Sequence, residues 1–90
     1  MFRYSISDKL KLIIDKLVKK DKKTAEIIYK KIKEIVNNDA ETIQRYKNLR
    51  HDLSDSKRVH INKSFVLTFK VDIENNFILF WDFDHHDNIY

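Results

Sequence analysis

The apolar residues of this chain change their spacing once, and that change constrains the fold more than any other feature. Up to position 36 they recur every three or four residues, the spacing that lines one face of an amphipathic helix. From Ser56 onward they alternate with polar residues, which is the period of a strand with one buried face. The sequence therefore predicts an α+β fold in which two helices precede an antiparallel sheet.

The helical part is preceded by a short alternating segment, residues 2–6, which predicts a first strand. Ser7 offers an N-cap oxygen to a helix that runs to about Lys20. A second apolar stripe, residues 25–36, follows a connection too short for anything except an antiparallel helical hairpin. Because the chain has no glycine, we expect one of the asparagines after this stripe to take a left-handed cap. Residues 39–56 predict a turn or two of irregular helix.

The second part predicts an antiparallel three-stranded meander. Its strands are expected at residues 56–61, 65–72 and 77–81, joined by turn-forming triplets. The last strand is apolar on both faces, as a central strand covered on both sides would be, so we place Trp81 in the core. The helical hairpin can cover one side of this sheet and leave the other open to solvent. The open side is expected to carry Arg58, His60, Thr68 and Lys70.

Length and cysteine content limit the chemistry. Ninety residues suit a single domain, 1–90, with one modest core and no deep substrate cavity. The absence of cysteine removes disulfides, thiolate nucleophiles and cysteine-bound zinc, and it fits a reducing compartment, so we expect a cytoplasmic protein. The apolar runs are only a few residues long, and residues 1–5 lack the layout of a secretion signal. We therefore expect no association with a membrane.

Charge is distributed unevenly along the chain. All 18 Lys and Arg lie within residues 1–70, whereas residues 71–90 carry five acids and no Lys or Arg. Such asymmetry is typical of a basic surface for a polyanion or for an acidic partner protein. The ten lysines between Lys9 and Lys33 also fit a simpler interpretation, in which they decorate solvated helices.

All four histidines fall between positions 51 and 86, in segments that this fold brings together. Cleavage of RNA through its own 2′-hydroxyl needs a proton acceptor, a proton donor for the leaving 5′-oxygen, and positive charge on the phosphorane. Histidine suits both proton transfers near neutral pH. The candidates are His51, His60, His85 and His86, with charge from Arg58 and Lys63 and a phenol from Tyr90. Four histidines can equally do no more than pack and form hydrogen bonds.

A divalent metal is the competing interpretation of the last segment, since oxygen and imidazole ligands suit zinc or manganese. The acid and histidine cluster consists of Asp82, Asp84, His85, His86 and Asp87. Consecutive histidines point differently unless the chain bends, and no second ligand cluster completes the shell. We therefore expect no metal and no other cofactor. Asp82 and Asp84 would then neutralise Arg58 or Lys70 across the sheet.

Four segments of the sequence, LRHDLS (49–54), KRVHI (57–61), FVLTFKV (65–71) and HHDNIY (85–90), resemble toxins of the RelE/ParE superfamily. The resemblance is closest to the RelE-like messenger-RNA interferases of the YafQ type. It extends to the element order, which in that family is a short strand, a helical hairpin and an antiparallel sheet. The resemblance implies a type II toxin that cleaves messenger RNA on the ribosome without a metal. It also implies a cognate antitoxin that wraps and silences the toxin.

The family's functional positions map onto this sequence one by one. Its loop histidine falls on His51, its strand histidine on His60, and its histidine four residues before a terminal aromatic on His86. Tyr90 is that aromatic, and His85 is the neighbour that many relatives also keep as histidine or lysine. The resemblance implies that His60 and His86 transfer protons with help from His51, while Arg58 stabilises the phosphorane and Tyr90 places the substrate. Phosphate contacts are expected from Lys47, Arg50, Lys57, Lys63 and Lys70.

Two departures from the family pattern keep other functions open. Ser64 stands where YafQ-like enzymes tend to carry an acid, and Asp55 and Ser56 replace a usual glycine. A catalytically decayed RelE-like binding protein is therefore one alternative. A ParE-like toxin that binds gyrase without cleaving RNA is another. The histidines at three matched positions favour the nuclease, because a pure binder has no evident need for them.

Overall fold

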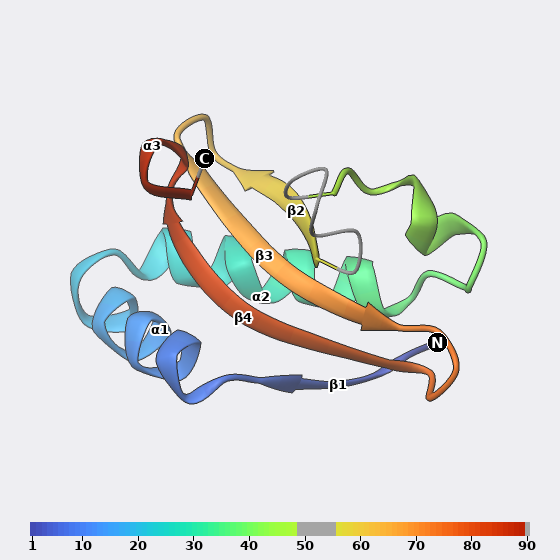
Figure 1. The fold of residues 1–90 in the computed structure, drawn as a ribbon. Coiled ribbons are helices and arrows are strands. Elements are labelled where there is room, and N and C mark those ends of the chain that lie inside the picture. The colour runs from blue at the N-terminus through green and yellow to red at the C-terminus, as the bar shows by residue number, and fades with distance from the viewer. Residues whose placement is uncertain (49–55, 90) are drawn as a thin grey trace.

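The structure, a computed structural model, describes residues 1–48 and 56–89 (Figure 1). Its strands are β1 (Arg3–Ile6), β2 (Ser56–Ile61), β3 (Phe65–Asp72) and β4 (Phe77–His85). Its helices are α1 (Asp8–Lys20), α2 (Lys22–Val36), the 3₁₀ turn η1 (Thr42–Arg45) and the short α3 (His86–Ile89). This order confirms the α+β fold with a first strand, two helices and a later antiparallel meander. No helix in the described ranges is long and apolar enough to cross a membrane.

The sheet has four strands in the order β1-β4-β3-β2. The meander of β2, β3 and β4 is antiparallel, as predicted. β1 joins its other edge by pairing in parallel with β4, from Arg3 opposite Phe77 to Ile6 opposite Phe80. The two helices lead from β1 to β2, at the opposite edge of the sheet, and β4 is a central strand because it lies between β1 and β3.

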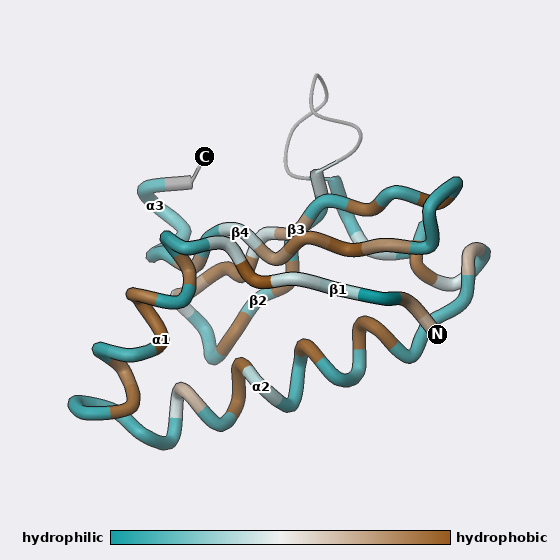
Figure 2. Tube along the Cα trace, turned by 90° about the horizontal axis from the view of Figure 1, so that it is seen from below, coloured by the Kyte–Doolittle hydropathy of each residue, from teal (hydrophilic) through white to brown (hydrophobic). Residues whose placement is uncertain are grey.

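Helices α1 and α2 cover one face of the sheet, and Figure 2 shows the hydrophobic side of α2 turned toward the strands. Ser7 caps α1 as predicted, because its side-chain oxygen accepts a hydrogen bond from Leu10 N at 3.1 Å. Asp21 alone separates the two helices. Its carboxylate accepts hydrogen bonds from the N–H and the hydroxyl of Thr24, so α2 begins at Lys22, before its apolar stripe.

The core lies between these two layers. α2 contributes fully buried isoleucines, and the sheet contributes Phe69 and Phe80, whose ring centroids are 5.6 Å apart. η1 closes one end of the core with Ile43, which is fully buried. The irregular turn expected in residues 39–56 is therefore present in its described portion.

The left-handed asparagines lie in the hairpin turns and not at the end of α2. Asn62 has φ 56° and Asn76 has φ 53°, one in each turn of the meander. Asn37, the residue after α2, is right-handed with φ −81°. The expected left-handed cap was therefore wrong. The Asn38 amide caps the helix instead, by donating hydrogen bonds to two carbonyl groups of the last turn at 3.0 and 3.1 Å.

The outer face of the sheet differs from the prediction at Thr68. We expected this residue to be open to solvent, but it is fully buried. Its short side chain lies between the cross-strand neighbours Arg58 and Asp82, and its hydroxyl donates a hydrogen bond to the Asp82 carbonyl at 3.3 Å. Larger neighbours therefore shield a small residue on a face that is otherwise partly exposed.

Trp81 is also placed differently, because it lies outside the core cluster and is half-buried. The pairing register shifts between Thr68, opposite Asp82, and Phe69, opposite Phe80, so Trp81 has no direct partner. This irregularity turns its ring toward the outer face, where the Lys70 ammonium lies 5.7 Å from the ring centroid. The same face of β4 leaves Phe77 and Leu79 half-buried, so β4 is central but is not covered on both sides.

Candidate active site

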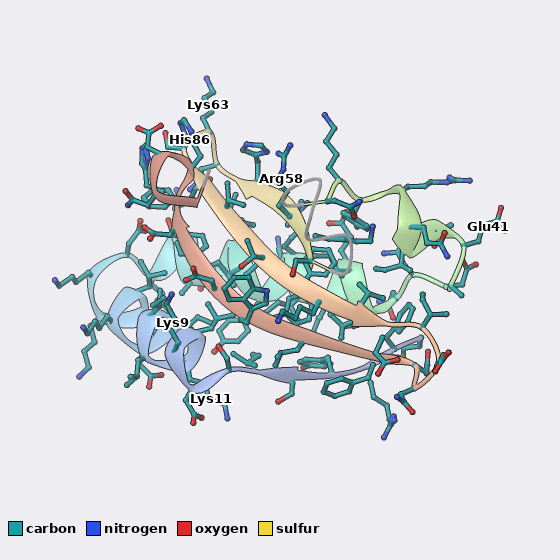
Figure 3. The ribbon with its side chains drawn as sticks, in the orientation of Figure 1. Lys9, Lys11, Glu41, Arg58, Lys63 and His86 are labelled. Carbon is teal, nitrogen blue, oxygen red and sulfur yellow. The ribbon has the colours of Figure 1, made fainter. Side chains whose placement is uncertain are left out.

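The end of β4 meets the turn between β2 and β3. The His86 N–H donates a 2.8 Å hydrogen bond to the Ser64 carbonyl oxygen, which fixes the start of α3 against that turn. Figure 3 shows His86 and Lys63 at this end of the sheet, with Arg58 further along β2. β4 continues past Trp81 because Asp84 and His85 pair with Val66 and Phe65. The histidines expected in a tail therefore sit on ordered strand and helix.

His85, His86 and Asp87 form a compact cluster at this junction. The two imidazole rings are stacked, with centroids 4.7 Å apart and 24° between their planes. The Asp87 carboxylate lies 3.4 Å from His85 Nδ1 and 3.1 Å from His86 Nδ1. The chain passes from strand to helix between the two histidines, and this bend brings consecutive rings to the same side. The expectation that these consecutive histidines point in different directions is therefore wrong.

Aromatic packing holds His85 from the sheet side. Its ring meets Phe65 edge to face at 5.7 Å, and Phe65 stacks on Phe83 at 5.2 Å. The Asp87 N–H donates to His85 Nδ1 at 3.2 Å, which restricts the ring further. The rotamer of this histidine is thus fixed by contacts from both β3 and α3.

His60 is exposed on β2, in a cross-strand row with Val66 and Asp84. Neighbouring strands are about 4.8 Å apart, so this row places His60 and Asp84 roughly 10 Å from each other. Side chains alternate between faces along a strand, and His85 pairs with the residue next to Val66. His60 and His85 therefore project from opposite faces of the same end of the sheet.

Hydrogen bonds hold the Asp84 carboxylate beside this cluster. It accepts hydrogen bonds from the Asn88 amide at 3.1 Å and from the His85 N–H at 2.7 Å. These bonds, the Asn88 amide first, hold the pKa of Asp84 below its ordinary value. A negative charge therefore remains beside the two histidines at neutral pH.

Arg58 is half-buried in the middle of β2. Its N–H donates to the Lys47 carbonyl at 2.9 Å and its Nε donates to the Asn48 carbonyl at 3.3 Å. Asp82, expected to neutralise Arg58 or Lys70, forms its ion pair with Lys9 at 3.2 Å. α1 begins beside β4, so Lys9 reaches this carboxylate from the helical layer. Nothing in the local sequence indicates that contact.

The lysines assigned to phosphate contacts fall into two groups. Lys47, Lys63 and Lys70 are exposed. Lys57 is 9% exposed, and its ammonium donates to the Tyr46 carbonyl at 3.1 Å and to Asn48 Oδ1 at 3.0 Å. Burial lowers the pKa of Lys57. Lys57 therefore links residues 46–48 to the sheet. Its ammonium is occupied by these contacts, so Lys57 is not among the lysines proposed to contact phosphates.

Three assigned residues, Arg50, His51 and Tyr90, lie outside the described residues. Asn48 was not singled out from the sequence, although it contacts both Arg58 and Lys57. Asn48 lies outside the named strands and pairs with Lys57 as an isolated bridge, so only the tertiary contacts reveal it.

Fold and site together define a small α+β protein whose sheet ends in a cluster of histidines beside a partly basic strand. The chain is 53% identical over 90 residues to "Putative toxin RelE4" of Methanocaldococcus jannaschii, covering 100% of this chain and 92% of that protein. It is 44% identical over the full lengths of both chains to a Methanosarcina mazei protein. No protein-family model matches the chain, and neither does any solved structure. The chain belongs to the RelE-like toxin family, which confirms the resemblance of its motifs.

Proposed function

We propose that this protein is the toxin of a type II toxin–antitoxin pair and that it cleaves messenger RNA on the ribosome by metal-free acid–base catalysis. The observation that carries the proposal is the ordered histidine pair of β4 and α3, fixed to the turn that follows the His60 strand. The name of the Methanocaldococcus jannaschii relative supports the toxin assignment.

The reaction needs one proton acceptor and one proton donor. A histidine takes the proton of the RNA 2′-hydroxyl, and the 2′-oxygen then attacks the adjacent phosphorus. The bond from phosphorus to the 5′-oxygen breaks, and a second histidine protonates that oxygen. The products are a 2′,3′-cyclic phosphate and a 5′-hydroxyl. We assign these two transfers to His60 and His86, with His51 and His85 assisting.

The remaining residues stabilise the negative charge of the phosphorane and position the RNA. Arg58 stabilises the negative charge of the phosphorane, and its two backbone contacts with the segment before β2 hold it in place for that role. Tyr90 aids placement of the substrate. Lys47, Arg50, Lys63 and Lys70 contact phosphates of the messenger or the ribosome. The basic character of residues 1–70 also suits an acidic antitoxin as partner.

His60 projects from β2 and His86 from α3, at the same end of the sheet. Because the stacked His85 and His86 rings lie on the side opposite to His60, the substrate phosphate has to lie at the rim of that end of the sheet if both histidines act on it. Binding on the ribosome is the step that would bring the messenger into this position, which fits a toxin that depends on the ribosome.

The test is inducible expression in a bacterial host, followed by primer extension on abundant messages. We expect the wild-type chain to arrest growth and to cut within translated codons, and His60→Ala and His86→Ala to lose both effects while remaining folded. Lys11→Ala, an exposed substitution on α1, is the matched control and should retain both. Full toxicity of both histidine variants would contradict the proposed function.

Other outcomes identify the alternatives. Growth arrest with intact messages would indicate a ParE-like toxin that binds gyrase. The absence of any phenotype would indicate a decayed protein, and Ser64→Asp would then test whether the missing acid is the cause. The Ser64 contact with His86 uses the main-chain carbonyl, so this substitution leaves that contact available.

A further inference from the structure

The histidine cluster at the end of β4 is also a compact set of metal-binding donors. Donor atoms of His85, His86 and Asp87 all lie within 4.8 Å of one another. In the part of the chain that the structure describes, these are the only three residues grouped in this way. Two neutral imidazoles and one carboxylate form a donor set that suits first-row transition metals such as zinc.

The separation between the Asp87 carboxylate and the His86 ring is close to the geometry of a bound ion. Zinc bonds to histidine nitrogen and carboxylate oxygen are about 2.0–2.2 Å long, so two ligands on a tetrahedral ion stand roughly 3.3 Å apart. Asp87 Oδ1 lies 3.1 Å from His86 Nδ1, which is close to that separation. Asp87 Oδ2 lies 3.4 Å from His85 Nδ1, which accepts the Asp87 N–H, so His85 would bind an ion through Nε2 or after losing that hydrogen bond. The donor atoms of all three residues lie within 4.8 Å of one another, so an ion bound by all three draws them closer together than they lie in the free protein.

The surroundings also favour a cation. The side chains of the three residues are between 39% and 71% exposed, which leaves room for water at a fourth position. The Asp84 carboxylate lies next to His85 and accepts hydrogen bonds from the His85 N–H and the Asn88 amide. Phe65 packs on the His85 ring and Ser64 anchors the His86 backbone, so the donors are held before any ion arrives.

We propose that His85, His86 and Asp87 bind one divalent transition-metal ion of the zinc type. The ion would use the imidazole nitrogens that the metal-free reaction needs for proton transfer. Bound metal and RNA cleavage therefore exclude each other at this site, so that zinc inhibits the protein. This consequence, unlike the metal site itself, rests on the proposed function.

The experiment measures zinc binding by the full chain, without RNA. Protein freed of metal by a chelator is titrated with zinc chloride in competition with a chromophoric zinc indicator. We expect one ion per chain for the wild type and at least a tenfold loss of affinity, of the order seen when metal-site groups are removed, for His86→Ala and for Asp87→Ala. Both variants leave His85 in its contact with Phe65.

His60→Ala is the matched control, since it removes an exposed histidine from another strand. It should bind zinc as the wild type does. In nuclear magnetic resonance spectra, the imidazole signals of His85 and His86 should shift on zinc addition while those of His60 stay in place. Wild-type affinity in both cluster variants, or an equal loss in His60→Ala, would overturn the site.

The same preparations separate this inference from the proposed function. If the chain binds zinc but does not cleave messages, the metal site is supported and the proposed nuclease function is refuted. Cleavage that continues unchanged with the site saturated by zinc would refute the inhibitory consequence alone.

Discussion

At the scale of single residues, Lys57 is a lysine whose function is structural. Its ammonium bridges the Tyr46 carbonyl and the Asn48 side chain from a position that is 9% exposed. Lys57→Met keeps most of the apolar stem but leaves both acceptors without this donor. We expect the free energy of unfolding to fall by about 1–2 kcal/mol, because two hydrogen bonds from a charged donor to partly exposed acceptors are lost. Urea denaturation followed by circular dichroism measures the change.

Lys47→Met is the matched control, because Lys47 is exposed on the same segment. Surface substitutions of this kind usually change stability by less than about 0.5 kcal/mol. If Lys57→Met proved no less stable than Lys47→Met, burial of the Lys57 ammonium would cost as much as its two hydrogen bonds contribute.

At the scale of secondary-structure elements, the junction of α1 and α2 depends on one carboxylate. The hydroxyl and the N–H of Thr24 donate to Asp21, and these bonds, the hydroxyl first, lower the pKa of Asp21 below 3.8. A lowered pKa in the folded state means that ionised Asp21 stabilises the fold above its unfolded pKa. This contribution is lost as the pH falls through the folded pKa.

The prediction concerns the difference in unfolding free energy between the wild type and Asp21→Asn. Asparagine is a comparable cap but does not ionise, so the difference should be constant above about pH 5 and should shrink as the pH falls below about 4. Denaturation curves at a series of pH values measure it. In a Thr24→Val background the hydroxyl donor is gone, and the pH dependence should be smaller. An undiminished dependence there would contradict the assigned cause.

At the scale of the whole molecule, the distribution of charge is expected to determine how the affinity for RNA depends on salt. Asp82 and Asp84 of β4 lie on the outer face, whereas Lys63 in the turn between β2 and β3 and Lys47 after η1 are exposed. Each lysine that contacts a phosphate should contribute about 0.7 to the slope of log affinity against log salt for single-stranded RNA. We expect Lys63→Ala to reduce this slope by about that amount, as measured by fluorescence anisotropy over a salt series.

Lys11→Ala removes the same charge from α1, in the helical layer, and should leave the slope unchanged. An equal reduction in both variants would mean that net charge, and not a defined contact surface, governs the affinity.

The sequence by itself determined the order and most boundaries of the elements. The strand over 65–72 coincides with β3, and Ser7 caps α1 as expected, because alternation and capping depend on residues within a few positions of each other. The family followed from short motifs, whose spacing is also local. The histidine positions of the candidate site came from these motifs, yet their roles in catalysis remain proposals.

Only the tertiary structure decided which distant residues meet. The pairing of β1 with β4, the irregularity that turns Trp81 outward and the burial of Lys57 all join segments far apart in the chain. Ser7, for example, donates its hydroxyl to the Trp81 carbonyl at 2.9 Å. No repeating pattern encodes such a contact, because it exists only after helices and sheet have packed. The stacking of His85 on His86 likewise depends on where β4 ends, and the pairing of β4 with β3 sets that point.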